Sequence, residues 1–509
     1  MMAERVDNVY RTTGSQWLLP VTEYLGFPLA LVNFLACQLF ALSFAFWFRL
    51  YLSPRRSSPL VRHTVAALLG VIFIIFCFGW YSTHLLAVVL ANYLIIIQAD
   101  ITNVHRYSMV VAMGYLTVCQ VSRVLIFKYE ILSTDFSGPL MIMTQKITSL
   151  AFQLHDGMCK KADELTAEQK LLAISVKPTL VEYLSYNLNF LSVLVGPFNN
   201  YKDYINFIEG THISSKLEQQ GASMTNGKNA YHKCPDPSPL NAVCQKLSVC
   251  CFCMLFFFII TRSLPITYNA HPHFVSHAPF ITRLTYAFFS IQAARPKFYF
   301  AWTLGDVINN AAGFGFSGMD EHGKATWNLL SNLNIMRVET ATSFKTFIDN
   351  WNIQTGNWLK MVCYNRAPRH RLVLTYILSA LWHGIYPGYY FTFITAIPLT
   401  LAARAVRKSF RHYFLGSRSL KLAYDVLTWA STQLAICYMV MPFLLLAVEP
   451  TMVYYRSMYF HMHILSILAV IVLHPKFKSK VISAITKATT HISFSQCLSV
   501  HCNNNDKTH

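Results

Sequence analysis

One histidine lies inside a long apolar run in the C-terminal part of the chain, and residues that break helices follow it. Gly384, Pro387 and Gly388 come shortly after His383. Proline lacks a backbone donor and glycine has a low helix propensity, so this stretch predicts a kink or an unwound turn. A neutral imidazole at such a place can act as a general base. The alternative is a buried histidine hydrogen-bonded to a neighbouring helix, and the residues alone leave both interpretations open.

Amide side chains form a second cluster, 31 residues before this histidine. Asn350 and Asn352 flank Trp351, and Lys345 and Lys360 lie on either side of them. Lys345 and Asn352 are seven residues apart, so on a continuous helix they share one face. An interfacial helix with an aromatic belt explains the tryptophan and the lysines, but it explains the amides less well. The cluster is therefore a second candidate for chemistry.

The composition indicates what kind of fold must position these residues. The chain has 509 residues, of which 54% are hydrophobic and 13% are charged. Soluble domains usually have roughly 25% charged residues. A soluble fold of this length has no room to bury so much apolar surface, and a disordered chain is excluded for the same reason. The composition therefore predicts a polytopic membrane protein.

A membrane-spanning helix needs about 20 mainly apolar residues, and the sequence contains about eleven such segments. Some of them carry glycine, proline, lysine or amides, as is typical of segments that pack inside protein or line a wet cavity. The clear segments are 29–50, 64–81, 84–98, 107–127, 243–260, 372–401, 422–448 and 452–473, and the weaker ones are 139–154, 180–195 and 284–307. The more polar segment 317–347 predicts a loop with short interfacial helices.

Polar segments divide the chain into three expected parts. Residues 1–26 form a polar N-terminal segment, and the first long apolar run, near Phe27, is expected to be a signal anchor. A membrane domain covers 27–475 and contains a polar extramembrane loop at 210–238. A basic and polar tail covers 476–509.

The net charge of +19 results from 42 Lys and Arg against 23 Asp and Glu. The bases lie in short runs beside apolar segments, as at Arg404 and Arg407. This placement suits membrane lipid head groups, the ends of membrane helices or an anionic soluble substrate. We therefore expect no nucleic acid partner.

Together, these motifs resemble the membrane-bound O-acyltransferase family. The resemblance rests on the Trp351–Asn352 pair, on Trp382–His383–Gly384 and on the run from Tyr386 to Tyr389, and the spacing of 31 residues between the asparagine and the histidine matches the family. Further stretches resemble its lysophospholipid acyltransferase branch, notably the acyltransferases for lysophosphatidylethanolamine and lysophosphatidylserine. These stretches are 135–139, 145–148, 196–197, 201–204 and 309–316.

This resemblance implies an all-α polytopic integral membrane protein of the endoplasmic reticulum, with short interfacial helices around a membrane-embedded catalytic tunnel. It implies an acyl-CoA-dependent O-acyltransferase of phospholipid remodelling, with acyl-CoA as co-substrate and no permanently bound cofactor or metal. Acyl-CoA would enter from the cytosolic side, and the lysophospholipid acceptor would enter laterally from the bilayer. Ethanolamine or serine head groups and an unsaturated chain such as oleoyl are what the branch implies.

The resemblance also implies roles for particular residues. His383 would be the general base, and Asn352 would either donate to the developing oxyanion or hold the acceptor hydroxyl. For the bases, the alternative to binding of the CoA phosphates is positive-inside topology. The substrate-binding candidates are Trp351, Lys345, Lys360, Tyr389 and Arg404.

Two rival functions stay open from the sequence. A transporter or channel is one, because broken helices with intramembrane polar groups suit it equally well. The other is a member of the same family that acts on a protein or sterol acceptor. The stretches typical of the lysophospholipid branch argue against the second rival.

Overall fold

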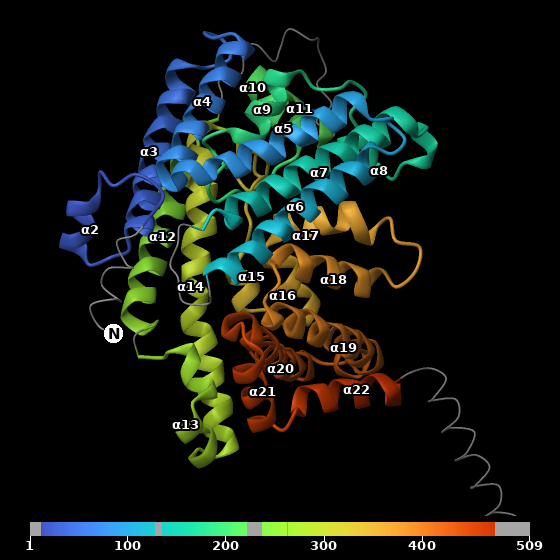
Figure 1. The fold of residues 1–509 in the computed structure, drawn as a ribbon. Coiled ribbons are helices and arrows are strands. Elements are labelled where there is room, and N and C mark those ends of the chain that lie inside the picture. Colours follow the sequence, from blue (N-terminus) through green and yellow to red (C-terminus); the bar gives the residue numbers. More distant parts are fainter. Residues whose placement is uncertain (1–11, 128–134, 221–236, 262, 474–509) are drawn as a thin grey trace, which may run out of the picture.

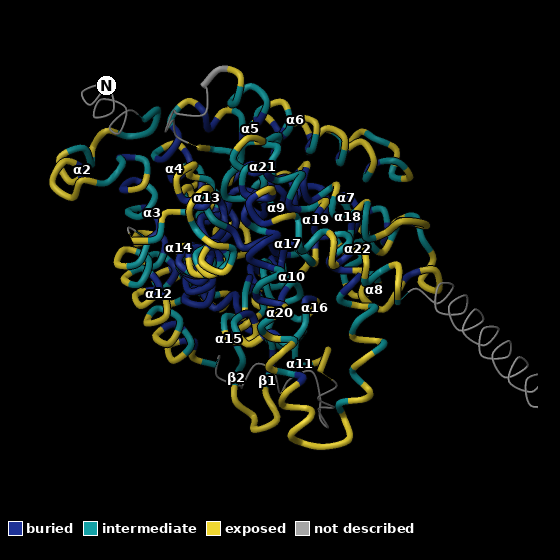
Figure 2. The backbone as a smooth tube through the Cα atoms, turned by 90° about the horizontal axis from the view of Figure 1, so that it is seen from below, coloured by how far each residue is buried: buried dark blue, intermediate teal, exposed yellow. Residues whose placement is uncertain are grey.

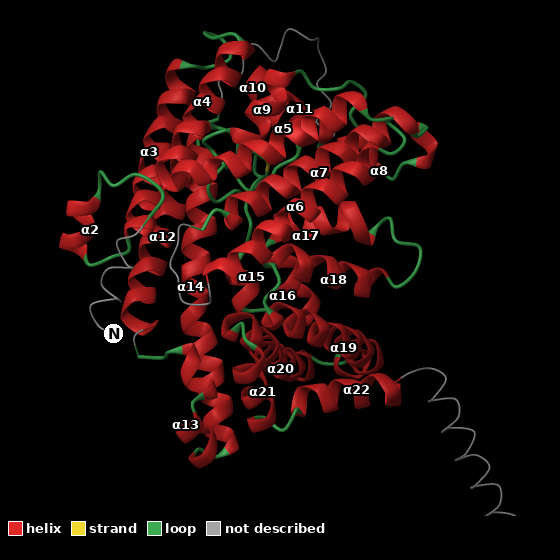
Figure 3. Cartoon of the chain, viewed as in Figure 1, coloured by secondary structure: helices red, strands yellow, loops and turns green. Residues whose placement is uncertain are grey.

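A computed structural model of the protein describes residues 12–127, 135–220, 237–261 and 263–473. Nearly all secondary structure in these ranges is helical (Figure 3), and a short antiparallel hairpin of β1 (Gly318–Met319) and β2 (Ala325–Thr326) is the exception. The predicted tail over 476–509 and most of the predicted loop at 210–238 lie outside the described residues. Within the described part of that loop, α11 (His212–Gln219) is helical.

The helices that precede residue 221 include most of the long N-terminal ones. They are α2 (Leu19–Leu25), α3 (Leu29–Tyr51), α4 (Pro59–Phe78), η1 (Gly79–Tyr81), α5 (Ser82–Gln98), α6 (Val104–Phe127), α7 (Ser137–Cys159), η2 (Ala162–Glu164), α8 (Ala167–Leu172), α9 (Leu180–Leu188), α10 (Tyr201–Glu209) and α11.

The helices after residue 236 include several short ones around the candidate residues Asn352 and His383. They are α12 (Leu240–Thr261), η4 (Ile266–Ala270), α13 (Pro272–His277), α14 (Phe280–Ala312), α15 (Ile335–Glu339), α16 (Phe344–Asn350), α17 (Ile353–Leu359), the π-helical η5 (Lys360–Tyr364), α18 (Arg371–His383), α19 (Pro387–Phe410), η6 (Arg411–Phe414), α20 (Arg418–Leu445), α21 (Val448–Ser457) and α22 (His461–Leu473). The predicted loop with short helices over 317–347 is confirmed by the hairpin, α15 and α16.

Six helical runs within the described residues are long and apolar enough to cross a membrane, and a seventh span results if α21 and α22, bent by 70°, are counted together. The protein is therefore a multi-pass membrane protein, but the predicted number of about eleven spans is not confirmed. The six runs are Leu29–Tyr51, Pro59–Gln98, Val104–Leu125, Leu240–Thr261, Pro387–Phe414 and Arg418–Leu445.

Local chemistry explains two of the differences from the predicted spans. The segment 180–195 is helical only to Leu188, because the side chain of Asn189 donates to the carbonyls of Ser185 and Tyr186 at 3.1 and 2.8 Å and so caps the last turn of α9. The segment 372–401 is divided into α18 and α19 around Gly384. Neither segment forms the single span that hydropathy predicts.

Two groups of helices and a long helix that connects them define the arrangement. In Figure 1, α18–α22 gather at one end of the molecule and α4–α11 at the other, and α14 extends past both groups. Buried residues concentrate in the interior, whereas the hairpin β1–β2 lies at the exposed rim (Figure 2).

Helix α7 lies in this interior and contacts α5, α6, α9, α17 and η5. It is polar although it is buried. Lys146, which is fully buried, donates to the carbonyl of Tyr186 at 2.9 Å and to the hydroxyl of Ser192 at 2.6 Å. Because buried polar groups require partners, these bonds allow a polar helix in the core. Helix α7 can therefore present further polar side chains to α17 and α18.

Candidate active site

His383 is the last residue of α18, and the helix ends there because of the glycine that follows. Gly384 has φ 135° and ψ −171°, a conformation that is nearly restricted to glycine. A Cβ atom at Gly384 would lie 3.3 Å from Cε2 of Tyr389, so the close approach also favours glycine. The predicted unwound turn after His383 is confirmed, and α19 begins four residues after His383 at Pro387.

Four aromatic rings surround the imidazole of His383. The ring of Phe393 stacks on it at a centroid distance of 5.3 Å, and the ring of Phe443 meets it edge-on at 5.0 Å. Tyr389 and Trp382 lie at 5.7 and 4.7 Å. We call these four residues with His383 the aromatic box.

The imidazole in this box makes no hydrogen bond to any of the described residues, although it is half-buried. The alternative interpretation, a histidine hydrogen-bonded to a neighbouring helix, is therefore not what this part of the chain shows. A ring nitrogen without a protein partner can accept a proton from a ligand.

Asn352 lies between α16 and α17 in the left-handed conformation, with φ 51° and ψ 52°. Asparagine tolerates this conformation better than most residues. The backbone beside it is held by the amide of Ile353, which donates to the carbonyl of Asn332 at 2.8 Å. Because α16 ends at Asn350, the prediction that Lys345 and Asn352 share one helix face is wrong.

The carboxamide of Asn352 is half-buried and has no hydrogen-bond partner within the described ranges. In this respect it resembles the imidazole of His383. Both side chains keep their full hydrogen-bonding capacity for a ligand.

Helix α7 makes a series of contacts with the segment that follows Asn352. Gln145 donates to Thr355 at 2.9 Å, Trp358 donates to Thr148 at 2.9 Å, and Arg366 donates to Asp156 at 3.0 Å. In each pair the two residues are 210 positions apart in the chain. The segment from α17 onward therefore lies parallel to α7 in constant register.

The end of α18 contacts the same helix at its N-terminal part. The indole of Trp382 donates to the carbonyl of Met141 at 3.1 Å, and its ring lies 5.8 Å from that of Trp358. Met141 thus holds the residue that precedes His383, and Gln145, four residues later in α7, holds Thr355 in the segment that follows Asn352.

The other substrate-binding candidates lie in different surroundings. Trp351 packs against Phe298, Tyr299, Trp302 and Phe347, with centroid distances of 5.3–5.9 Å.

The three basic candidates lie towards the surface. Lys345 forms an ion pair with Asp349, and its side chain is 74% exposed. Lys360 and Arg404 are exposed as well. None of the three bases hydrogen-bonds to Asn352 or His383 in the described chain, whereas Tyr389 packs against the ring of His383.

Gln120 of α6 is a residue of this region that the sequence analysis missed. Its side-chain amide donates to the carbonyl of Trp382 at 3.1 Å, and its oxygen Oε1 is buried without a partner among the described residues. The only signal in the sequence is a polar residue inside the apolar run 107–127. Its partner is 262 residues away in the chain.

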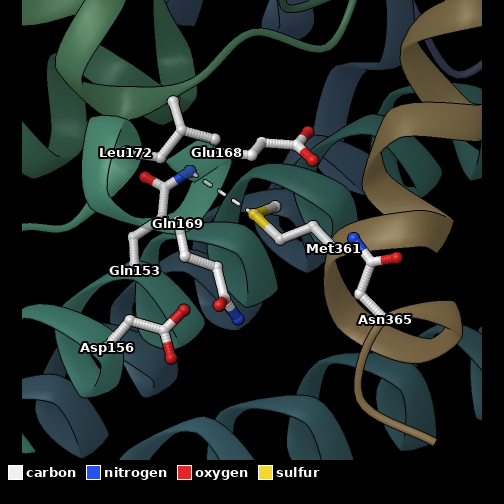
Figure 4. A pocket seen from close by; sticks show the side chains of 7 residues that line it. All are labelled: Gln153, Asp156, Glu168, Gln169, Leu172, Met361 and Asn365. Atoms are coloured by element: carbon white, nitrogen blue, oxygen red, sulfur yellow. Dashed lines mark hydrogen bonds between the residues drawn. The ribbon is translucent and has the colours of Figure 1, made fainter. Parts of the chain in front are cut away.

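A small pocket lies at the opposite end of α7 (Figure 4). Asp156 and Glu168 give it an acidic lining, so it does not suit the phosphates of a nucleotide-like substrate. Gln153 donates to the sulfur of Met361 across it at 3.7 Å. The lining residues are Gln153, Asp156, Glu168, Gln169, Leu172, Met361 and Asn365.

Comparison with known proteins identifies relatives of this chain. Residues 121–445 match the model of the MBOAT, or membrane-bound O-acyltransferase, family. A mouse (Mus musculus) protein named membrane-bound glycerophospholipid O-acyltransferase 1 is 57% identical over 91% of this chain and 94% of its own length. A chicken (Gallus gallus) protein named membrane-bound glycerophospholipid O-acyltransferase 2 is 53% identical over 91% of this chain and 88% of its own length. A Drosophila melanogaster protein named lysophospholipid acyltransferase 6 is 37% identical over 91% of this chain and 64% of its own length.

Proposed function

Because the chain belongs to the membrane-bound O-acyltransferase family and is therefore an acyltransferase, we propose that it transfers a fatty acyl group from acyl-CoA to the free hydroxyl of a lysophospholipid. The names of the glycerophospholipid and lysophospholipid acyltransferases among its relatives support this acceptor class. We further propose lysophosphatidylethanolamine and lysophosphatidylserine as acceptors, oleoyl as a transferred chain and the endoplasmic reticulum as the site of action. Membership of an acyltransferase family argues against the transporter or channel alternative. The names of the relatives favour a lipid over a protein or sterol acceptor.

In the proposed reaction, His383 is the general base. A glycerol hydroxyl is a weak nucleophile at neutral pH, and a neutral imidazole can take its proton as the oxygen attacks the thioester carbon. A new ester C–O bond forms, the thioester C–S bond breaks, and the CoA sulfur leaves with the electron pair of that bond. The imidazolium then returns its proton to the sulfur, so that free CoA thiol is released and the histidine is neutral again. The observation that carries this proposal is an imidazole without a protein partner inside the aromatic box.

Asn352 supplies the second polar group of the reaction. Its amide N–H either stabilises the oxyanion that develops at the thioester carbonyl or holds the acceptor hydroxyl. Its position near His383 is supported by two contacts of α7, since Met141 bonds to the residue before His383 and Gln145 bonds to Thr355, three residues after Asn352. The left-handed backbone at Asn352 fixes the direction in which the side chain leaves the chain.

The remaining candidates are assigned to substrate binding. Tyr389 forms one wall of the aromatic box, and Trp351 contributes an apolar surface beside Asn352. Lys345, Lys360 and Arg404 are exposed cations that attract the phosphates of acyl-CoA. Their exposure means that each contributes little alone.

An assay of the purified protein in liposomes tests the proposal. Oleoyl-CoA and lysophosphatidylethanolamine are supplied, and both the diacyl product and the free CoA thiol are measured. The wild-type enzyme should release thiol and product in equal amounts, and His383→Ala should lower turnover by about 100- to 10,000-fold. His322→Ala, which removes an exposed histidine of the hairpin, is the matched control and should retain turnover. Full turnover by folded His383→Ala would refute the assignment, and lipid movement without thiol release would refute the reaction.

A further inference from the structure

The first observation concerns the amide of Gln120. Its Nε2 donates to the carbonyl of Trp382, so its Oε1 must point elsewhere. Gln120 is only 7% exposed, and Oε1 is buried without a donor among the described residues. A Cβ built on Gly384 would lie 3.6 Å from the amide nitrogen, which places this side chain at the turn after His383. Its Oε1 is thus a buried acceptor beside the turn that follows His383.

The second observation is a charge pair one helical turn further along α6. Arg123 lies 2.5 Å from the carboxylate of Asp135 and donates to the hydroxyl of Ser137 at 2.9 Å. The backbone amide of Ser137 donates to the same carboxylate at 2.9 Å. The two charged side chains are 31% and 47% exposed, so water or a ligand can reach both of them. An ion pair with this exposure adds little stability, so exchanging its partners costs little.

The third observation links this pair to the aromatic box. A Cβ atom at Gly384 would lie 3.3 Å from Tyr389 and 3.6 Å from Gln120, so both side chains meet at this turn, and the ring of Tyr389 lies 5.7 Å from the imidazole of His383. Gln120 and Arg123 are three residues apart on α6, which corresponds to a rise of about 4.5 Å. Polar side chains therefore extend from His383, past Gln120, to Arg123 and Asp135.

We propose that Arg123 and Asp135 form the subsite for a zwitterionic lysophospholipid head group. Arg123 binds the phosphate, and Asp135 accepts hydrogen bonds from the primary ammonium of ethanolamine or serine. Gln120 is a positioning residue that ties the end of α18 to α6 and so sets the depth of the reacting hydroxyl. This inference rests on the proposed function, because it assigns the acceptor of that reaction.

The chemistry of the head group matches the pair. Phosphate and guanidinium form charge-assisted hydrogen bonds, and an ammonium with N–H donors does the same with a carboxylate. A zwitterion supplies both charges at once, so it can replace the internal ion pair without leaving either group unpaired. A head group without an ammonium leaves the carboxylate beside its phosphate, which is unfavourable.

Kinetics of two single variants in liposomes test the subsite. With lysophosphatidylethanolamine, Arg123→Gln and Asp135→Asn should each raise the acceptor KM about tenfold, which corresponds to the loss of one charge-assisted contact. The kcat of each variant should stay within about threefold of the wild-type value. With lysophosphatidylglycerol, measured as a substrate or as a competitor, Arg123→Gln should weaken binding, and Asp135→Asn should leave it unchanged or improve it. An unchanged KM for lysophosphatidylethanolamine in either variant, or an equal loss for both lipids in Asp135→Asn, would overturn the proposal.

A charge swap separates this role from a purely structural ion pair between α6 and α7. The double variant Arg123→Asp, Asp135→Arg restores an ion pair but exchanges its two ends. It should keep the KM for oleoyl-CoA, which reports a folded enzyme, and should still show the raised KM for lysophosphatidylethanolamine. Recovery of the wild-type acceptor KM by the swap would show that only the ion pair matters and would overturn the proposal.

Matched controls are Arg106→Gln at the other end of α6 and Asp163→Asn in η2, both exposed, and each should keep the wild-type acceptor KM.

The experiment also distinguishes a failure of the proposed function from a failure of the head-group subsite. A wild-type enzyme that acylates no lysophospholipid refutes the proposed function, whereas an active enzyme insensitive to Arg123 and Asp135 refutes only the head-group subsite.

Discussion

The two ends of helix α7 contrast in how their polar neighbours are used. At the C-terminal end, Asp156 accepts from Arg366 at 3.0 and 2.5 Å and lies 3.3 Å from Lys160. In the segments that contact its N-terminal half through Trp382 and Thr355, the imidazole of His383 and the carboxamide of Asn352 have no hydrogen-bond partner in the described ranges. The first arrangement holds α7 to the segment after η5, whereas the second leaves polar groups without a protein partner. We therefore propose that polar side chains near α7 divide into structural and reactive ones by their partners rather than by their residue types.

Among the variants that test this comparison, Asn352→Ala is expected to have the largest effect on kcat. Loss of an oxyanion donor typically lowers kcat by about 100- to 1000-fold. The side chain has no partner among the described residues, but alanine costs about 1–2 kcal/mol more in the left-handed conformation, so the thermal midpoint of the purified enzyme should fall only modestly. Asn328→Ala, an exposed amide after the hairpin, is the control for kcat. A kcat of Asn352→Ala near the wild-type value would show that the left-handed position serves the backbone alone.

The opposite pattern is expected for Arg366→Ala at the other end of α7. Removal of Arg366 leaves the nearly buried carboxylate of Asp156 with only the more distant Lys160 and His155, and the loss in the free energy of unfolding should be about 3 kcal/mol. Thermal unfolding followed by intrinsic fluorescence measures the loss, and kcat of the enzyme that remains folded should be largely retained. Lys345→Ala, which breaks the exposed pair with Asp349, should cost less than about 1 kcal/mol. Equal thermal midpoints for Arg366→Ala and Lys345→Ala would contradict the structural role of the Arg366–Asp156 pair.

A smaller effect on both properties is expected for Gly384→Ala. The backbone conformation disfavours any side chain by about 1–3 kcal/mol, and the new methyl group would press on Tyr389. The midpoint should fall, and kcat should fall as well because His383 is displaced within the aromatic box. Gly416→Ala is the control, since a Cβ there meets no atom within 4 Å in the described part of the chain. If both variants behave alike, the turn after His383 is not strained in the way described.

The smallest effects are expected from charge reversal of the exposed bases. Lys360→Glu and Arg404→Glu should raise the KM for acyl-CoA about three- to fivefold without changing the acceptor KM, because exposed ion pairs contribute about 1 kcal/mol or less. Lys345→Glu should act more weakly, since Asp349 already neutralises this lysine. Initial rates over a range of acyl-CoA concentrations measure these shifts. An unchanged KM in all three variants would assign the bases to membrane topology.

The sequence predicted some local features of the site correctly because they depend on neighbouring residues. The break after His383 follows from Gly384 and Pro387 themselves. The left-handed turn at Asn352 was not predictable in the same way, since it is held by a bond from Ile353 to Asn332, twenty-one residues earlier. Hydropathy identified a membrane protein, but it did not distinguish membrane spans from the buried helix α7, whose polar side chains find partners inside the fold.

Long-range contacts account for what the sequence analysis missed. In the sequence, Gln120 is one polar residue in an apolar run. Its contact with Trp382, 262 residues away, is formed only in the folded protein. The head-group subsite likewise requires the end of α6, the start of α7 and the box around His383 to meet. The roles of Asn352 and His383 themselves remain predictions that the kinetics must decide.

The most direct test of the central claim is a structure of the enzyme with a lysophospholipid and a non-transferable acyl-CoA analogue, in which a methylene group separates the sulfur from the carbonyl. We predict that the acceptor hydroxyl oxygen lies within about 2.6–3.2 Å of an imidazole nitrogen of His383, and that the Asn352 amide bonds to that oxygen or to the analogue's carbonyl. An acceptor hydroxyl outside the aromatic box, with His383 in contact with neither substrate, would contradict the account.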